Sequence, residues 1–368
     1  MITALGIRNF KRFITLDLAF RQLTVLTGVN GTGKSTALQG ILLARQAAEN
    51  ASAHVVQLNG PYGLGLGEAF DILHPDADQQ EIEIRIETAQ APYRYLFEVP
   101  DGRALNLPVR ERPNGTPRVL SGQGMSFSYL NAERLGPRDQ LDVTAEDPDL
   151  IGVGVRGEYT AQALALHETV EVREALRHPR TQEHGVTTLR TQVEDWASEI
   201  IRPIRITAQW PPGITASLIR FQEPGLISDQ VRPTNMGFGF SYALPILVAG
   251  LLMPKEGVLI VENPEAHLHP AGQSRMGRFL GKVAGSGAQV IVETHSDHVI
   301  NGIRLAVAED RVIDSTSVVV HFFGEEEDGG VTAIELTSRG GLTIWPKGFF
   351  DQIEVDLGRL ARAKRREG

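Results

Sequence analysis

The sequence predicts an α/β protein with a parallel β-sheet at its centre. Three short apolar runs, Val258 to Val261, Val290 to Val292 and Val318 to Val320, are rich in β-branched residues and are separated by stretches of helical character. Such continuous runs are typical of strands buried on both faces of a parallel sheet. A fourth apolar run, residues 23–26, leads into a glycine-rich turn and then an amphipathic stretch, which is the strand–turn–helix order found in such folds.

Composition limits the class of protein. The chain has 368 residues, which allows two domains or one large domain with insertions. Its charge of −9, 42% apolar residues and 22% charged residues are ordinary for globular proteins and exclude disordered, collagen-like and coiled-coil chains. The longest apolar run, Ala243 to Met253, is too short to span a membrane, and the first residues lack the hydrophobic core of a signal peptide. The absence of cysteine excludes disulfides and thiolate metal sites, and we expect a cytoplasmic protein.

Local periodicity predicts the remaining elements. We expect strands at residues 2–8, 14–20, 81–88, 93–99, 204–209 and 215–221, and helices at about 34–53, 160–177 and 189–201. Two stretches rich in Gly, Pro or Asp, residues 54–80 and 100–124, are predicted loops. The stretch of about 55–240 would then be a helical and β insertion between two halves of one core.

The strongest motif is a phosphate-binding loop. Residues 28–36, Gly-Val-Asn-Gly-Thr-Gly-Lys-Ser-Thr, match G-x-x-x-x-G-K-[ST] and lie between a predicted strand and a predicted helix. Glycines let successive N–H groups converge on phosphate oxygens, and the helix N-terminus adds partial positive charge. Lys34 would contact the β and γ phosphates, and the Ser35 hydroxyl would bind Mg²⁺. The nucleotide-binding residues expected here are Asn30, Gly31, Thr32, Gly33, Lys34, Ser35 and Thr36.

Two of the apolar runs end in polar residues. Glu262 follows the first run, where a carboxylate reaches the Mg²⁺ side of the phosphates, because open α/β sheets bind ligands at the carboxyl ends of their strands. His295 follows the second and could hydrogen-bond a γ-phosphate or an attacking water. Alone, Glu262 is as readily a structural strand end, and a single histidine at a strand end is usually a core residue. Beside a phosphate loop, a catalytic interpretation is favoured, with Ser35 and Glu262 as metal ligands.

Together these residues resemble ABC-type ATPases of the SMC, RecF and overcoming-lysogenisation-defect group. The opening strand before Gly-x-Asn-Gly-x-Gly-Lys-Ser is characteristic, Asn235 to Ser241 looks like a degenerate ABC signature, Leu268 to Pro270 occupies the D-loop position, and His295 matches the switch histidine. The sequence is also similar to small bacterial AAA-like ATPases of an uncharacterised-domain family. The motifs shared with that family are residues 129–138, 235–245, 262–270 and 343–352.

The resemblance implies a P-loop NTPase core of ABC or SMC-head type with an inserted helical and β subdomain. Its parts would be residues 1–130 (N-terminal ATPase lobe), 131–245 (inserted helical and signature lobe), 246–330 (C-terminal ATPase lobe) and 331–368 (C-terminal extension). ATP and Mg²⁺ would be the cofactors. In an ATP-dependent homodimer, each ATP would lie between one phosphate loop and the partner's signature. The residues implied are Lys34, Glu262, Glu265 and His295 for catalysis, and Arg12, Gly237, Gly239 and Ser241 as further nucleotide contacts.

One departure from that group affects hydrolysis. Most of its members carry an Asp-Glu pair where this chain has Glu262-Asn263. An amide can position a water molecule but cannot accept its proton at neutral pH. Glu265 is the nearest replacement, so hydrolysis is expected to be slow, to use Glu265, or to require a partner.

Weaker features each carry two interpretations. His267 and His269 are spaced as zinc ligands could be, but a third ligand is not evident and the D-loop interpretation needs no metal. Asn131 or Glu133 could approach the Mg²⁺ water, or form structural contacts. The apolar residues of 348–366 favour a helix docked on the core, with a partner-binding helix as the alternative. DNA phosphates could be contacted by two basic groups, Arg103, Arg110, Arg112 and Arg118 in one loop, and Arg359, Arg362, Lys364, Arg365 and Arg366 at the C-terminus.

Three functions are compatible with these features. The first is an ATP-driven switch that dimerises and couples to DNA or to a separate nuclease or other effector chain, in genome maintenance or phage defence. The second is a nucleotide-gated assembly scaffold with little or no hydrolysis. The third, a small-molecule kinase, leaves Gly237 to Ser241 and His295 without a role.

Overall fold

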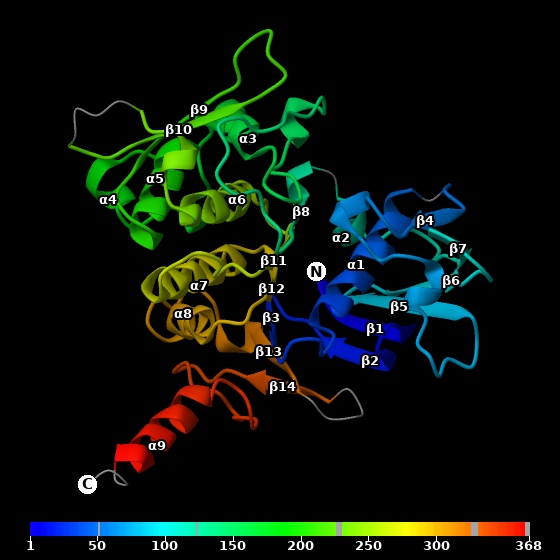
Figure 1. The fold of residues 1–368 in the computed structure, drawn as a ribbon. Helices are drawn as coiled ribbons and strands as arrows, with labels where there is room; N and C mark the ends of the chain where they lie inside the picture. Colours follow the sequence, from blue (N-terminus) through cyan, green and yellow to red (C-terminus); the bar gives the residue numbers. More distant parts are fainter. Residues whose placement is uncertain (51, 123, 226–229, 325–329, 365–368) are drawn as a thin grey trace.

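The fold consists of two six-stranded sheets and a helical lobe (Figure 1). In this computed structural model, every residue is described except 51, 123, 226–229, 325–329 and 365–368. None of the helices in the described part of the chain combines the length and apolar character that crossing a membrane requires.

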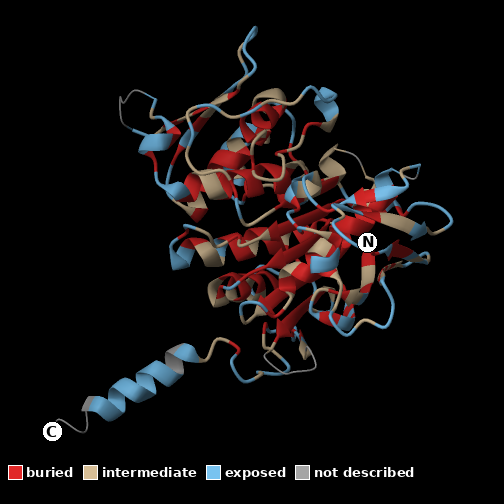
Figure 2. Ribbon diagram, turned by 45° about the vertical axis from the view of Figure 1, so that its right-hand side comes forward, coloured by how far each residue is buried: buried red, intermediate tan, exposed pale blue. Residues whose placement is uncertain are grey.

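The central sheet contains the predicted parallel strands. Its order is β14-β13-β3-β12-β11-β8, and neighbouring strands are parallel except β13 and β14. The three apolar runs form β11, β12 and β13 and are buried, which confirms that prediction (Figure 2). The strands are β3 (Leu23–Gly28), β8 (Phe127–Leu130), β11 (Val258–Glu262), β12 (Gln289–Glu293), β13 (Val318–Phe323) and β14 (Val331–Glu335).

The second sheet is antiparallel and has the order β2-β1-β5-β6-β7-β4. Its strands are β1 (Ile2–Phe10), β2 (Phe13–Ala19), β4 (Val55–Gln57), β5 (Glu81–Thr88), β6 (Pro92–Glu98) and β7 (Asn106–Glu111). The isoleucines of β5 alternate with charged residues and are buried, as expected for a strand with one solvated face. Helix α1 (Lys34–Glu49) follows the phosphate loop and packs against β1 and β5.

This arrangement corrects three predictions. Residues 54–80 are not a continuous loop, because they contain β4. Residues 100–124 are not a continuous loop, because they contain β7 and the short helix α2 (Arg118–Ser121). Residues 55–240 are not one insertion, because β4 to β7 complete the sheet begun by β1 and β2, and β8 joins the central sheet beside β11. Pairing with strands elsewhere in the sequence determines where these strands form.

The helical lobe lies beyond the β8–β11 edge of the central sheet (Figure 1). It contains α3 (Thr160–His167), α4 (Thr181–His184), α5 (Leu189–Ile200), α6 (Phe238–Leu252) and the hairpin of β9 (Arg205–Gln209) and β10 (Leu218–Gln222). Helix α3 ends ten residues earlier than the predicted Arg177, because the chain turns at residue 168 and Val170 accepts a backbone hydrogen bond from Leu189. The β-branched residues that follow have a lower helix propensity, which favours the end of the helix at this point.

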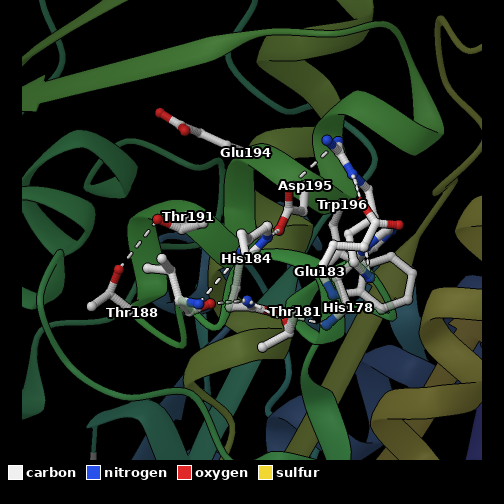
Figure 3. A network of polar contacts seen from close by, with 12 residues as sticks. His178, Thr181, Glu183, His184, Thr188, Thr191, Glu194, Asp195 and Trp196 are labelled. Carbon is white, nitrogen blue, oxygen red and sulfur yellow. Dashed lines mark hydrogen bonds and ion pairs between the residues drawn. The ribbon is translucent and has the colours of Figure 1, made fainter.

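A network of polar contacts fastens α4 to α5 in this lobe (Figure 3). Nδ1 of His184 accepts the backbone N–H of Val186 at 3.0 Å, so Nε2 carries the proton and donates to Asp195 at 2.9 Å. His178 repeats the pattern, with the backbone N–H of Arg180 and the carboxylate of Glu199. All four ring nitrogens have partners within the lobe, which accounts for these histidines structurally.

Helices α7 (Pro270–Gly285) and α8 (Asp297–Ala308) cover one face of the central sheet and pack closely on each other (Figure 1). Glycine permits this approach. A Cβ atom at Gly277 would lie 2.1 Å from the carbonyl oxygen of Val299, and one at Gly302 would lie 1.9 Å from that of Ser274. The two backbones therefore touch directly.

Helix α9 (Gln352–Lys364) projects from the body of the molecule, and those of its side chains whose burial is described are exposed (Figures 1 and 2). Phe349 is buried and packs edge-on against Phe322, and Phe350 is partly buried against the same core. Leu357 and Leu360 are each 60% exposed. The prediction that the helix docks on the core is therefore wrong for α9, because these leucines face solvent and the docked aromatic residues precede the helix.

Candidate nucleotide-binding site

The phosphate loop runs from the end of β3 to the start of α1, and glycine is required at both ends. Gly28 has φ 137°, and a Cβ atom there would lie 2.2 Å from the carbonyl oxygen of Phe323. Gly33 has φ 98°, and its Cβ would lie 2.3 Å from the ring of Phe13. Thr32 donates its hydroxyl to the carbonyl of Val29 at 2.7 Å, which closes the turn.

Lys34 lies at the base of this loop and is only 4% exposed. Its Nζ donates to the carbonyl oxygens of Gly28 at 3.1 Å and Val29 at 2.7 Å. Burial lowers the pKa of Lys34, and the charge of Glu293 opposes that change. The ammonium group is thus held where the loop would wrap around a phosphate.

The outer part of the loop faces solvent. Asn30 and Gly31 are exposed, whereas Thr36 is buried in the first turn of α1. Arg12 donates from Nη1 to the carbonyl of Gly31 at 2.6 Å. The structure therefore brings Arg12, which only the family resemblance implicated, into contact with the phosphate loop.

Ser35 points toward the end of strand β12. Its Oγ donates to both carboxylate oxygens of Glu293, at 3.0 and 3.1 Å. Glu293 is 5% exposed, and burial, followed by the charge of Glu262, raises its pKa to about 7. Sequence reasoning did not single out Glu293. The signal was present, because a carboxylate ends the run 290–292 just as Glu262 ends the run 258–261.

Glu262 lies beside Glu293 and is held by β8 and the segment that follows it. The Tyr129 hydroxyl donates to one carboxylate oxygen of Glu262 at 2.8 Å, and the backbone N–H of Ala132 donates to the other at 3.1 Å. Burial raises the pKa of Glu262, and these hydrogen bonds act in the opposite direction. Burial likewise raises the pKa of Tyr129, which keeps the phenol protonated as a donor.

Arg134 ties three parts of the site together. It is 2% exposed, and its guanidinium donates to the carbonyl oxygens of Asn131 at 3.0 Å and of Glu262 and Asn263 at 2.6 Å each. The same group lies 5.3 Å from the ring centre of Tyr242 in α6. Burial lowers the pKa of Arg134 to about 10, so it remains charged at neutral pH.

Glu265 and His295 meet at the ends of β11 and β12. One carboxylate oxygen of Glu265 accepts the Thr294 hydroxyl at 2.7 Å, and the other accepts the backbone N–H of His295 at 2.8 Å. The imidazole of His295 is exposed, and partial burial, followed by the charge of Lys34, lowers its pKa. Glu265 is therefore anchored beside His295.

Asn263 has an unusual environment. Its backbone has φ 45°, and its N–H donates to the carbonyl of Glu293 at 2.8 Å. Its side-chain oxygen is buried and has no hydrogen-bond partner among the described residues, as is also true of the side-chain oxygen of Asn131. Glu133, in contrast, lies at the surface and pairs with Arg156.

The segment that resembles an ABC signature, Asn235 to Ser241, spans the start of α6. Gly237 is the exposed N-cap, with extended backbone angles, and the helix starts at Phe238. Gly239 is buried, and a Cβ there would lie 3.0 Å from the carbonyl of His267. Ser241 is half-buried and lines a cavity with Gly136, Arg138 and Leu244.

The two D-loop histidines have contacts other than a metal. The ring of His267 lies 5.0 Å from that of Phe238 and 4.5 Å from that of Tyr242. Nδ1 of His269 accepts the N–H of Ala271 and caps α7. Within the ranges that the structure describes, no group of three or more His, Cys, Asp or Glu residues is arranged to hold a metal ion.

The arginines expected to share one loop lie on different elements. Arg103 pairs with Glu68, and Arg110, on β7, pairs with Glu81. Arg112 donates to the backbone carbonyls of Ala47 and Ala53. These intramolecular partners make the group a poor candidate for a DNA-binding surface. Arg365 and Arg366 of the C-terminal group lie outside the described residues.

The donor set fits a nucleotide bound with Mg²⁺. A serine hydroxyl and carboxylate oxygens are the ligands that Mg²⁺ prefers, and the lysine and loop amides suit the phosphates. Ser35 and Glu262 supply such oxygens, Glu293 accepts the Ser35 hydroxyl behind them, and Lys34 lies beside this group. Fold and site together define a P-loop NTPase of the ABC/SMC-head type.

Comparisons with known proteins agree. The chain belongs to the family described as "AAA domain, putative AbiEii toxin, Type IV TA system", whose match covers residues 23–125 and 159–301. Residues 313–360 match a family described as "Protein of unknown function (DUF3696)". Family and fold are those of nucleotide-binding ATPases. No curated protein matches the chain.

Solved structures of SMC heads share the fold. A Pyrococcus furiosus Smc head domain with an extended coiled coil, bound to the C-terminal domain of ScpA, is 13% identical with a TM-score of 0.52, and the match covers 99% of each chain. An Smc head bound to the C-terminal winged-helix domain of ScpA is 13% identical with a TM-score of 0.51, covering 91% of this chain and 98% of that one.

Proposed function

We propose that this protein is a Mg²⁺-dependent ATPase that works as an ATP-driven switch. The observation that carries the proposal is the convergence of the phosphate loop, with Lys34 and Ser35, on the carboxylates that end β11 and β12. A glycine-rich turn with a structural role would not require a buried lysine beside buried carboxylates, which are costly to desolvate.

Each group has a distinct task in this mechanism. The loop amides and Lys34 bind the phosphates, and Ser35 and Glu262 hold the Mg²⁺, which neutralises charge developing on the phosphates when bound. Glu265 is the group that we assign to accept a proton from the attacking water, because Asn263 cannot. The position of Glu265 against the backbone of His295 supports this assignment.

We also propose that ATP joins two copies of the chain. The exposed N-terminus of α6, at Gly237, would complete the nucleotide site of the partner copy, and Arg12 would contact the nucleotide at the outer edge of the phosphate loop. Phe238 supports this proposal, because it is 52% exposed and stacks on His267 in the D-loop. Aromatic residues are enriched at protein–protein interfaces, so an exposed phenyl ring beside the nucleotide site suits contact with a second copy.

The output of the switch would pass to DNA or to a separate effector chain in the cytoplasm, in genome maintenance or phage defence. Two of the matched SMC heads are bound to domains of ScpA, and the family description refers to a toxin of a toxin–antitoxin system. Both descriptions suit a head that acts through a partner. A nucleotide-gated scaffold with little hydrolysis is the second candidate, and the amide at Asn263 favours it.

Calorimetry of ATP binding tests the nucleotide site. Lys34→Ala should abolish binding, because the phosphates lose their buried countercharge, while the exposed Lys347→Ala should bind as the wild type does. Equal affinity in wild type and Lys34→Ala would refute the assignment.

Light scattering tests the dimer. At saturating Mg²⁺-ATP the wild type should become dimeric, and Gly237→Asp should bind ATP yet remain monomeric, because a carboxylate would face the partner's phosphates. Neither Gly237 nor the control Gly65 has a described atom within 4 Å of an added Cβ, so Gly237→Asp and Gly65→Asp should both fold. A wild type that hydrolyses ATP while monomeric would rule out the dimer.

A further inference from the structure

We propose that Glu293 is a positioning residue of the metal site, which orients the Ser35 hydroxyl and supplies a second carboxylate beside Glu262, so that ATP binds tightly only together with a divalent cation. This inference rests on the proposed ATPase function. It adds a residue from strand β12 to a site otherwise built from the phosphate loop and β11.

Topology puts Glu293 in the middle of the site. Strand β12 lies between β3, which leads into the phosphate loop, and β11, which ends in Glu262. Glu293 pairs with Glu262 on one side and with Leu26 on the other. In a parallel pair, residues in register project to the same face of the sheet, so the two carboxylates stand side by side next to the loop.

The hydrogen bond from Ser35 gives Glu293 a specific task. A hydroxyl that binds a cation through an oxygen lone pair still carries a proton, which requires an acceptor. Both oxygens of Glu293 accept from Ser35 Oγ, and this fixes the proton on the side of the hydroxyl that faces β12. The lone pairs are then free to face the cation. Mutation of a group that hydrogen-bonds to a metal ligand commonly changes metal affinity 10–100-fold.

The charges around Glu293 predict opposite effects on ATP binding with and without a divalent cation. Glu293 is almost fully buried and stands in register beside Glu262, and Lys34 of the phosphate loop is the neighbouring cation. ATP without a metal brings further negative charge to this pair and is repelled. A divalent cation reverses the balance. A carboxylate that merely held β12 in place would affect both forms of ATP alike.

The experiment is a pair of ATP-binding titrations of the full chain by calorimetry, one in Mg²⁺ and one in EDTA. Glu293→Gln keeps the shape and an acceptor oxygen but removes the charge. It should weaken binding about 10–100-fold in Mg²⁺ and strengthen binding in EDTA. Glu194→Gln, in the helical lobe, is the control for replacing a buried glutamate, and should change neither titration.

The outcomes are distinguishable. If Glu293→Gln changes the ATP affinity equally in Mg²⁺ and in EDTA, or changes it in neither, the inference is overturned and the ATPase proposal remains intact. A wild type that binds no ATP in Mg²⁺ would instead remove the proposed function.

A second variant keeps the test decisive should Glu293→Gln not fold. Glu293→Asp retains the charge but is too short to keep the Ser35 contact in place. It should therefore lose affinity in Mg²⁺ and keep the wild-type affinity in EDTA. Wild-type affinity of this variant in Mg²⁺ would contradict a role through Ser35.

Discussion

Arg134 is almost fully buried and donates hydrogen bonds to three backbone carbonyl oxygens. Removing its guanidinium would leave these acceptors unpaired, and each such loss costs about 1–3 kcal/mol. Arg134→Ala should therefore lower the free energy of unfolding in urea by about 3–5 kcal/mol. Arg156→Ala, which breaks the exposed pair with Glu133, should cost less than about 1 kcal/mol. Equal losses in the two variants would contradict the bracing role of Arg134.

Substitutions at Glu265 and Asn263 distinguish the two ways in which the attacking water could be activated. If Glu265 accepts the proton of the attacking water, Glu265→Gln should slow steady-state turnover about 10²–10⁴-fold, and Asn263→Glu should gain nothing. ATP affinity in Mg²⁺, measured alongside, should change little in Glu265→Gln, because Ser35 and Glu262 remain. A faster Asn263→Glu variant would show instead that the lost carboxylate limits the wild type.

Glu293 should make stability depend on pH. Its pKa is raised from 4.5 to about 7 in the folded chain. Between these values the folded state binds more protons than the unfolded one, so the free energy of unfolding falls as pH rises. In EDTA and without nucleotide, Glu293→Gln should be more stable than the wild type at pH 8, by up to about 3 kcal/mol, and the difference should vanish only below about pH 4. A difference that is the same at both pH values would contradict this shift.

At the scale of elements, the contact between α7 and α8 depends on glycine. Gly302→Ala would drive a methyl group into the carbonyl of Ser274, so the helices must separate. We expect a loss of about 3 kcal/mol or more in urea unfolding, because overpacking typically costs 1–3 kcal/mol and here the obstacle is backbone. Gly358→Ala on α9, where no described atom lies within 4 Å of the added group, should not lower stability. A tolerated Gly302→Ala would show that the helices can shift.

Elements with strong local patterns were predictable, and elements that depend on distant pairing were not. The apolar runs at β11, β12 and β13 and the phosphate loop carry their own signals. Strand β7 has three polar or charged residues and a proline among its six, and it exists because β6 and β4 pair with it. Strand β8 has only four residues, and its place beside β11 cannot be inferred from its own composition.

The candidate site shows the same division at the scale of the whole molecule. Lys34, Ser35, Glu262 and His295 follow from motifs, because each motif is contiguous in sequence. The roles of Glu293 and Arg134 follow from strand order, which brings residues more than 100 positions apart into hydrogen-bond contact. An isolated sequence gives no such order. It is the spatial arrangement of β3, β12 and β11 that makes a strand-terminal glutamate part of a nucleotide site.

Helix α9 stands clear of the rest of the molecule, so nothing in the described fold shields its backbone from a protease. A helix of 13 residues without tertiary support is marginally stable in water and opens readily. Trypsin should therefore cleave first after Arg359 and Arg362, both exposed, and leave a shortened chain that binds ATP as tightly as the intact one. Cleavage elsewhere at equal speed would contradict this. If Mg²⁺-ATP slows this cleavage, α9 is protected from trypsin in the ATP-bound state. The digestion rate then measures directly how much of the protein is in that state.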